Sequence, residues 1–316
     1  MKFRGLFCVV LMLGLMAGGV GAEEMPKEGF SGYVFLGGGY MKGDLALDDA
    51  MEEDNQTISS LNPSVKDSSV AMPLVSGELN YLFSTKTMVG LNMGVEDGPG
   101  IRITQFAGDL GVFSVGGAFY RDDVWKDPYL TGQARSKTDR DVISIYTAWD
   151  AVMNTDLSIR YGVKDVDVDE DVAGAAEKDL QRDGMIHSLR VSYPLFSKGV
   201  HMLAADATGE LGDMDGESES FKGGEVGLTH IWVGNSWDLT TGIGYGMRDY
   251  DKKHVKFNRE REDKVYTAET ALTLYRPFGF ENYYVSFFGR YEKKDSNIQF
   301  YDSSFTMAGM GAGFRF

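Results

Sequence analysis

Apolar and polar side chains alternate along much of the chain with a period of two residues. Within 155–164, every second residue from 157 to 163 is apolar, and the residues between them are polar or glycine. This spacing fits a strand with one apolar and one polar face, and it does not fit the 3.6-residue period of a helix. The same alternation occurs in 75–83, 237–245 and 283–291. The pattern predicts an all-β protein.

Continued along the chain, the alternation predicts about 14 strands, within a range of about 12 to 16. Their expected starts are near Gly29, Pro73, Thr87, Gly100, Leu110, Asp141, Thr155, Gly184, Val200, Gly223, Trp237, Asp263, Asn282 and Thr306. Long inserts at 43–72, 121–140, 165–183, 211–222 and 249–262 are separated by short links at 84–86, 151–154, 196–199, 234–236 and 277–281. The link at 96–99 is the exception, because it is short but belongs to the end at which the long inserts are expected. Long connections at one end and short ones at the other are typical of an outer-membrane barrel.

The chemistry of the two strand faces separates a membrane barrel from a soluble one. A soluble barrel fills its interior with large apolar side chains, whereas the polar face here carries charges and glycines, which suits a wet lumen. Aromatic residues also gather near the strand ends, as in the interfacial girdles of membrane barrels. The expected girdle residues are Trp232, Trp237, Tyr275, Phe278, Phe280 and Tyr283 beside short links, and Tyr40, Tyr120, Trp125 and Tyr250 beside long inserts.

The first 22 residues have the organisation of a secretory signal. Lys2 and Arg4 precede an apolar stretch at 6–16, and small residues follow at 20–22. A membrane anchor is the alternative, although the glycines of this segment disfavour it. Beyond residue 22, no apolar run approaches the roughly 20 residues that a membrane-spanning helix needs. We therefore expect a cleaved signal peptide at 1–22 and a single barrel domain at 23–316.

The last predicted strand alternates up to Phe314 and Phe316, with glycines between its apolar residues. It closely resembles the C-terminal signature strand of Gram-negative outer-membrane β-barrel proteins, which ends in an aromatic residue recognised by the insertion machinery. The resemblance implies a transmembrane antiparallel up-and-down β-barrel in the bacterial outer membrane. Phe314 and Phe316 would form the assembly signal, and the insertion machinery, membrane lipid and lipopolysaccharide would be partners.

Within this superfamily the chain is porin-like. Six residues, 23–28, lie between the expected cleavage point and the first predicted strand, which is too few for an N-terminal plug, and no periplasmic domain is expected after the last strand. Any constriction is then expected to come from inward side chains or from a loop folded into the barrel.

Charge and cysteine content exclude several classes of function. The chain carries 31 Lys and Arg against 47 Asp and Glu, a net charge of −16. Loss of Lys2 and Arg4 with the leader leaves 29 basic residues and a net charge of −18. This balance disfavours nucleic acid as a partner. The only cysteine, Cys8, lies in the leader, so disulfides, thiolate nucleophiles and cysteine metal sites are not expected in the mature chain.

A catalytic site is not indicated. His187 and Ser188 are adjacent in a predicted strand, so their side chains point to opposite faces and do not share a proton. The motif of the outer-membrane phospholipases, which they superficially resemble, is absent. We therefore expect the protein not to be an enzyme.

Two acidic runs, 165–171 and 213–219, raise the question of a metal site. The first begins like an EF-hand loop, but Glu170 stands where that motif requires Gly and Ala176 where it requires Glu. No specific metal site or cofactor is predicted, while loose binding of divalent cations by these loops stays open. The mixed charges of 249–264 suggest a solvated hairpin extension, with contact to lipopolysaccharide phosphates as the alternative.

These features favour a channel for passive diffusion of small hydrophilic solutes, with selectivity set by the width and charge of the narrowest point. One rival is a closed barrel with a structural or surface-interaction role, in which opposite charges pair across the lumen and seal it. A barrel enzyme and a soluble secreted β-sandwich are further alternatives. The candidate pore-lining residues, assigned by strand alternation, are Glu78, Arg102, Arg160, Arg190, Asp238, Arg248, Glu269 and Arg290.

Overall fold

The computed structural model describes residues 28–44, 47, 55–62, 68–94 and 98–316, so the predicted leader lies outside the described residues. The strands are β1 (Gly29–Asp44), β2 (Ser68–Leu82), β3 (Thr87–Gly94), β4 (Gly98–Phe106), β5 (Val112–Trp125), β6 (Lys137–Asp150), β7 (Ser158–Val168), β8 (Gly184–Lys198), β9 (His201–Met214), β10 (Phe221–Val233), β11 (Trp237–His254), β12 (Arg259–Tyr275), β13 (Tyr283–Ser296) and β14 (Ser303–Arg315). The helical segments are α1 (Val172–Ala176) and the 3-10 turns η3 (Gly108–Leu110), η4 (Val152–Asn154), η5 (Lys178–Leu180), η6 (Pro277–Gly279) and η7 (Gln299–Tyr301).

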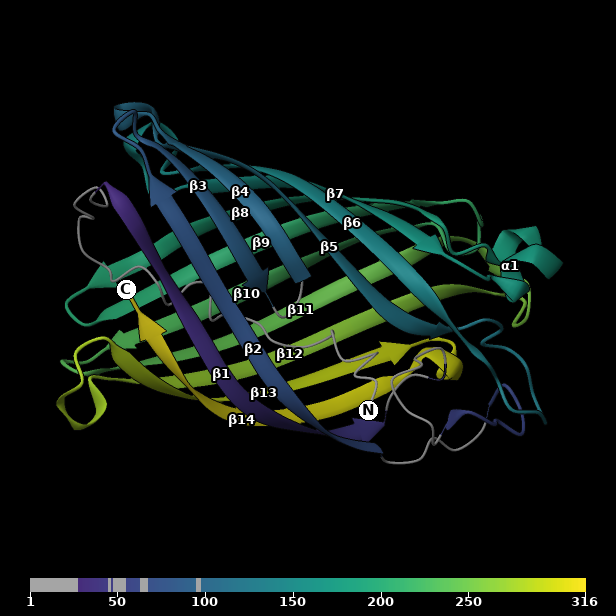
Figure 1. Ribbon diagram of the computed structural model, residues 1–316. Coiled ribbons are helices and arrows are strands. Elements are labelled where there is room, and N and C mark those ends of the chain that lie inside the picture. Colours follow the sequence, from purple (N-terminus) through teal and green to yellow (C-terminus); the bar gives the residue numbers. More distant parts are fainter. Residues whose placement is uncertain (1–27, 45–46, 48–54, 63–67, 95–97) are drawn as a thin grey trace.

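The strands form one closed barrel (Figure 1). Each strand pairs antiparallel with its neighbours in sequence, and β1 pairs with β14 from Tyr33 opposite Arg315 to Asp44 opposite Ser304. The predicted antiparallel up-and-down barrel of about 14 strands is therefore confirmed. Among the described residues, no helix is long and apolar enough to cross a membrane.

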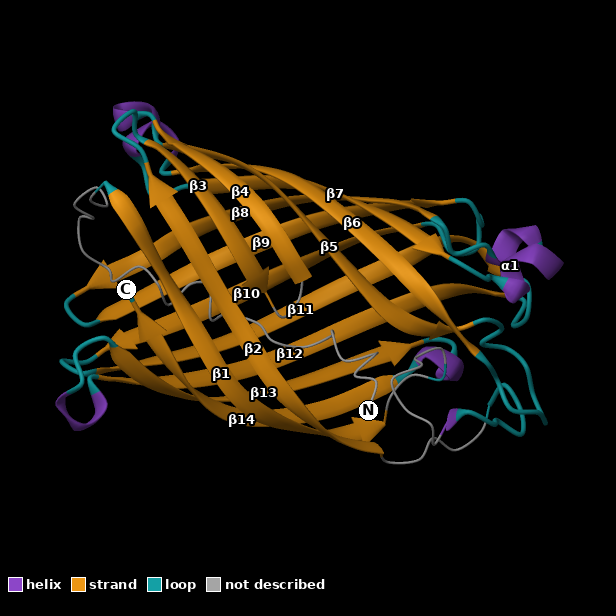
Figure 2. Cartoon of the chain, in the orientation of Figure 1, coloured by secondary structure: helices purple, strands orange, loops and turns teal. Residues whose placement is uncertain are grey.

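The two ends of the barrel differ in their connections. One end, the short-turn end, carries tight links such as 199–200, where Gly199 adopts the left-handed conformation with φ +62° that favours glycine. The other end, the long-loop end, carries the longer links and α1, which projects to the right in Figure 2. This alternation of long and short links agrees with the sequence prediction. The β3–β4 link is the short exception.

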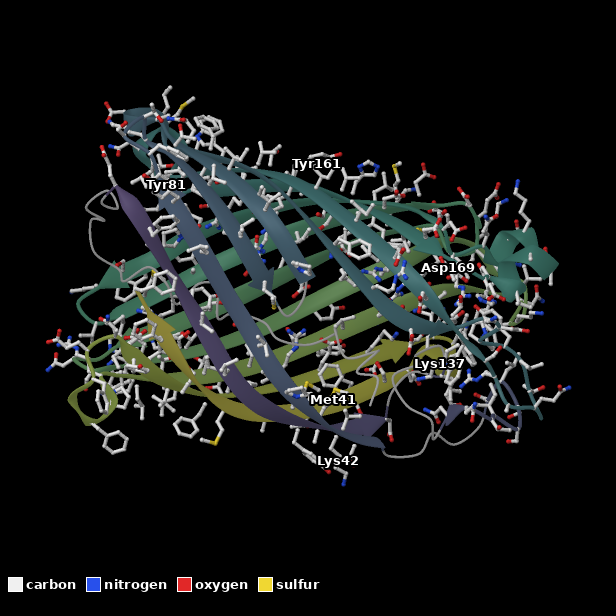
Figure 3. The ribbon with its side chains drawn as sticks, viewed as in Figure 1. Met41, Lys42, Tyr81, Lys137, Tyr161 and Asp169 are labelled. Atoms are coloured by element: carbon white, nitrogen blue, oxygen red, sulfur yellow. The ribbon has the colours of Figure 1, made fainter. Side chains whose placement is uncertain are left out.

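The outward face of the wall is apolar along the middle of the strands. Ile145 on β6 and Ile243 on β11 are 59% and 63% exposed, and Val75 and Ile101 are also exposed. Since the barrel is closed, apolar side chains that are this exposed lie outside it. Adjacent residues point to opposite sides of the wall, as Figure 3 shows for the buried Met41 and the exposed Lys42 of β1.

Several strands extend further toward the long-loop end than the alternation predicted. Asp165 and Asp167, expected in an acidic loop, lie in β7 and are exposed, while Val166 and Val168 between and beside them are buried. Here the apolar side chains face inward, because the inside is filled by loops and the outside meets water. Because the apolar residues face inward and the acidic residues face outward here, the sequence pattern was interpreted as an acidic loop and not as a strand. Likewise, Asp213 lies in β9, and most of 249–264 lies in β11 and β12.

The girdle assignments were only partly right. Tyr40, Trp232 and Tyr283 are exposed and lie on outward positions, and Phe278 and Phe280 are exposed in a short link. The assignments of Tyr120, Trp125, Tyr250 and Tyr275 were wrong. By register, Tyr120, Tyr250 and Tyr275 share the inward side of their strands, and Trp125 is fully buried against Arg135. Strand-end aromatics belong to a girdle only if their position in the alternation points outward.

Candidate functional site

All eight predicted pore-lining residues occupy inward positions of the wall. The register connects them: Arg160 lies opposite Arg190, and Glu269 lies opposite Arg290. Glu78 and Arg102 flank the inward side of β3, while Asp238 and Arg248 share the inward side of β11. Their influence on selectivity stays a prediction.

Several of these charges form ion pairs that follow the wall. Arg102 on β4 binds Glu78 on β2, and Arg248 Nη2 on β11 donates to Glu210 Oε2 on β9 at 2.6 Å. In each case the pair reaches over an intervening strand at a glycine, Gly90 of β3 or Gly223 of β10. A Cβ on Gly223 would lie 3.4 Å from the Arg248 side chain. The inward glycines thus let charged side chains lie flat along the wall.

Other inward charges follow the same pattern. Arg190 on β8 lies 3.3 Å from Asp206 on β9, and the Asp206 carboxylate lies over Gly227 of β10, where a Cβ would come within 2.7 Å of it. The Arg190 side chain is still 47% exposed. A charged side chain that faces the lumen and keeps nearly half its surface accessible indicates space beside the wall at this point. Similarly, Glu269 lies over Gly242.

The remaining predicted residues have aromatic partners or a partner on the same strand. The Arg160 guanidinium lies 3.8 Å from the ring centroid of Tyr146, which is cation–π geometry. Asp238 accepts a hydrogen bond of 2.6 Å from the Tyr275 hydroxyl. Arg290 donates to Glu292 on its own strand at 2.6 Å.

The sequence interpretation missed several inward acids. Asp206 and Glu210 on β9, Glu225 on β10 and Glu292 on β13 share the lumen face with the predicted set. Asp206 stands in an alanine-rich segment whose alternation is weak, because alanine suits either face. Arg190 pairs with Thr208, and this register shows that Asp206, two residues from Thr208, faces inward.

A contrasting part of the inner wall is apolar. It runs over β12, β13, β14, β1 and β2, and we name it the apolar strip. Its buried members pack together with half-buried aromatic residues at the same wall. The apolar strip consists of Tyr33, Phe35, Met41, Met72, Leu74, Tyr275, Tyr284, Phe288, Phe305 and Met307.

Alternate glycines of β14 accommodate the aromatic rings of this strip. The Phe288 ring lies over Gly309, the Phe35 ring over Gly311 and the Tyr284 ring over Gly313. At each glycine an added Cβ would collide with the ring. The glycines between the apolar residues of the last strand therefore form a smooth inner surface on which flat rings rest.

At the long-loop end, residues from different links form a second apolar cluster, which we name the loop core. Its members come from the links β1–β2, β5–β6, β7–β8 and β13–β14. Arg135, 1% exposed, donates to the carbonyls of Leu47 and Pro128 at 2.6 and 2.8 Å and so ties two links together. The loop core consists of Leu47, Ile58, Tyr129, Ala173, Leu180, Ile298, Phe300 and Tyr301.

The loop core extends across the barrel mouth. The Tyr129 hydroxyl, from the β5–β6 link, lies 2.8 Å from the Tyr301 hydroxyl and 3.0 Å from His254 Nε2. Tyr301 follows β13 and His254 ends β11, and these strands lie on the opposite side of the ring from β5 and β6. A contact between opposite sides narrows the axial opening at this end.

The acidic runs have structural partners. Asp171 caps α1 by accepting from the Gly174 amide and binds Arg182 at 2.7 Å. Within the described part of the chain, no group of three or more His, Cys, Asp or Glu side chains is placed to hold a metal ion. His187 lies 2.8 Å from the Tyr161 hydroxyl on the outward face, whereas Ser188 points inward, so the two residues are separated by the wall as expected.

Solved structures with a similar fold include outer-membrane proteins and channels. The outer-membrane channel DcaP of Acinetobacter baumannii has a TM-score of 0.47 at 10% identity, covering 91% of this chain and 97% of that one. OmpTdeltaL8, a loop-deletion mutant of the Vibrio cholerae outer membrane protein OmpT, has a TM-score of 0.44 at 8% identity, with 92% and 100% covered. An anion-selective porin from Comamonas acidovorans has a TM-score of 0.42 at 12% identity, with 91% and 98% covered.

Comparison with protein families gives a direct assignment. A search of curated protein sequences found no match to this chain. The model of the family described as "Protein of unknown function (DUF2860)" matches residues 29–315. This match starts with β1 and ends with β14, so it covers every strand of the barrel. The chain belongs to the DUF2860 family.

Proposed function

We propose that this protein is a channel of the bacterial outer membrane through which small hydrophilic solutes diffuse passively. The observation that carries the proposal is the accessible, charged inner wall of a closed barrel, shown best by Arg190. The apolar outward face would meet lipid, and the long-loop end would face the cell exterior, next to lipopolysaccharide. No cofactor and no catalytic residue enter this proposal.

The mechanism would be diffusion along the charged part of the wall. Ion pairs such as Arg248 with Glu210 hold the charges against the wall instead of extending them across the lumen. Solutes would exchange water contacts for contacts with these groups, and selectivity would follow from the charge at the narrowest point. The contact across the mouth within the loop core supports a narrowest point at the long-loop end.

A closed barrel with a structural or surface-interaction role is the second candidate, and one specific observation favours it. The bonds of Tyr129 to Tyr301 and His254 join opposite sides of the mouth. Ion pairs along the wall favour the channel, because sealing by charge requires pairs across the lumen.

Single-channel recording of the refolded protein in a planar bilayer tests the proposal. We expect discrete conductance steps, and Tyr129→Ala should increase their size because it removes the contacts across the mouth. Tyr40→Ala, at an outward exposed position, is the matched control and should leave conductance unchanged. A correctly assembled protein that conducts only as the Tyr129→Ala variant would support the closed barrel instead.

A further inference from the structure

Two of the four histidines of the chain meet on the barrel wall. His201 begins β9, and His230 lies in β10, the neighbouring strand of the barrel (Figure 1). His201 Nδ1 lies 3.1 Å from His230 Nε2. The two residues are 29 positions apart in the sequence, so only the pairing of β9 with β10 brings them together. We name these two side chains the histidine pair.

The histidine pair faces away from the lumen and is accessible. The register places His201 opposite Trp232, which is 40% exposed at an outward position. His230 lies two residues before Trp232 and therefore shares its face of the strand. Both histidines are half-buried, and His201 directly follows the tight link at 199–200. The pair thus lies at the short-turn end, where dissolved ions can reach the ring nitrogens.

The two facing nitrogens are separated by a distance that suits a shared metal ion. Imidazole nitrogens are preferred ligands of Zn²⁺, Cu²⁺ and Ni²⁺. Two metal–nitrogen bonds of about 2.05 Å, drawn to nitrogens 3.1 Å apart, enclose an angle of about 98°. This angle falls between the values of about 90° and about 109° for square-planar and tetrahedral coordination, which Cu²⁺ and Zn²⁺ prefer. The strands therefore already hold the two nitrogens at a chelating distance.

The surroundings favour a metal ion that binds nitrogen over one that binds oxygen. None of the residues paired with the two histidines in the register is acidic, and one of them adds a positive charge. These residues are Lys198, Leu203, Trp232 and Thr241. Ca²⁺ and Mg²⁺ need carboxylate and carbonyl oxygens, which these side chains do not supply. Cu²⁺ binds most strongly in the series of divalent first-row metals, so it is the best suited to overcome the nearby charge.

We propose that the histidine pair is a transition-metal site. His201 Nδ1 and His230 Nε2 bind Cu²⁺ or, more weakly, Zn²⁺ and Ni²⁺, and water completes the coordination. On binding, the ring that donates the hydrogen bond moves its proton to its other nitrogen, so both rings stay neutral and both facing nitrogens offer a lone pair. The site lies outside the lumen, so this inference goes beyond the proposed channel function and does not depend on it.

A copper titration of the refolded, untagged protein tests the site. Trp232 is a built-in reporter, because its ring centroid lies 5.4 Å from that of His201 and bound Cu²⁺ quenches indole fluorescence nearby. Excess Ca²⁺ is present throughout, so that acidic loops do not compete for copper. His201→Ala and His230→Ala are the test variants. His187→Ala is the matched control, because His187 is also outward but bonds to the Tyr161 hydroxyl.

Loss of copper affinity in the test variants alone is the expected result. The unmodified protein and His187→Ala should show the same saturable quenching, whereas removal of either member of the histidine pair should weaken binding by about tenfold or more, because half of the protein ligands are lost. Undiminished affinity in His230→Ala, or no saturable quenching in the unmodified protein, would overturn the proposal.

A second measurement needs no substitution and covers a variant that fails to fold. Electron paramagnetic resonance of Cu²⁺ bound to the unmodified protein reports its ligand atoms. We expect hyperfine splitting from two imidazole nitrogens, and a spectrum with oxygen ligands only would contradict the site. Conductance is measured separately, so a protein that binds copper through nitrogen but does not conduct keeps the metal site and loses the channel function.

Discussion

At the scale of single residues, the inner wall depends on pairs made of a glycine and a large side chain from the next strand. Glu269 lies over Gly242, Asp206 over Gly227 and the Phe288 ring over Gly309. The glycine provides no contact of its own, but it allows its neighbour to lie along the wall. Glycine positions therefore influence lumen width as much as the large side chains do.

We expect Gly309→Val to lower the free energy of unfolding by roughly 1–3 kcal/mol, the usual range for overpacking. The new side chain would displace the Phe288 ring from the wall toward the lumen, so conductance should fall as well. Ala308→Val, outward on the same strand, is the control and should stay within about 0.5 kcal/mol. Chemical denaturation in lipid vesicles measures both variants, and equal stabilities would show that the ring does not rest on the glycine.

On the outward face, the stability cost of a new charge should depend on its depth in the membrane. Ile145→Arg, near the middle of β6, should cost roughly 2–4 kcal/mol of unfolding free energy, because it places a charge near the bilayer midplane. Ile159→Arg should cost only about 0–1 kcal/mol, because Ile159 is the second residue of β7 at the short-turn end, near the interface. Arg160→Ala, inward beside Ile159, should mainly alter charge preference. The same loss of stability at Ile145 and Ile159 would argue against a lipid-facing band centred on Ile145.

At the scale of elements, the alternation was sufficient to locate all the strands. Expected starts at Thr87, Gly184 and Trp237 coincide with the observed ones. The largest errors lie at the long-loop end, where Pro73 and Asp263 were taken as starts and the strands begin several residues earlier. In this region the loops replace water inside the barrel, so the polarity of each face depends on tertiary packing. A pattern in one segment carries no information about which distant links will cover it.

The difference between local alternation and tertiary packing also explains which features of the lumen the sequence predicted. Strand parity placed Glu78 and Arg290 on the inward face because strongly apolar neighbours fixed the other face. Parity did not reveal the apolar strip, because an aromatic residue at an inward position looks like one at an outward position until register is known. Nor did it reveal the loop core, whose contact between Tyr129 and Tyr301 joins residues 172 positions apart.

The last strand is the element with the clearest test. The Phe316 amide donates to the Gly32 carbonyl at 3.1 Å, and the Gly32 amide donates to Phe316 at 3.0 Å, so this residue takes part in barrel closure. Deletion of Phe316 should impair outer-membrane assembly without altering export across the inner membrane. Phe280→Ala, an exposed aromatic in a short link, is the control. Normal amounts of heat-modifiable, membrane-inserted protein after the deletion would contradict the assembly role.

At the scale of the whole molecule, charge is distributed unevenly between lumen and surface. The sequence suggests a cation preference at low salt, because acidic loops are expected at the extracellular mouth. It also suggests a drift toward neutral or anion preference as salt rises, because the predicted lumen set contains five arginines and three acids. Asp206, Glu210, Glu225 and Glu292 add four further inward acids. The lumen is therefore less basic than the sequence indicated.

We accordingly expect a weak cation preference that decreases with salt and does not reverse. Acidic groups at the long-loop end are screened within about 8 Å at physiological ionic strength, whereas charges along the lumen wall are screened less. Reversal potentials across a KCl gradient, measured at two ionic strengths, test this expectation. Asp206→Asn should shift the preference toward anions, and Asp109→Asn in a short-turn link is the matched control. Anion preference at high salt in the unmodified protein would show that the arginines of the lumen wall dominate ion selectivity.

The contact of Tyr129 with Tyr301 also sets an order of events during folding. Because the two residues belong to links on opposite sides of the ring, their contact requires that the intervening strands have already curved into a cylinder. Contacts this distant in sequence form slowly, since a long chain segment must be ordered first. We expect protease resistance of the β5–β6 link to develop after heat-modifiable barrel has formed, and resistance that precedes it would refute this order. The loop core would then form late in folding. It would protect the links from protease only in those molecules in which the first and last strands have already paired.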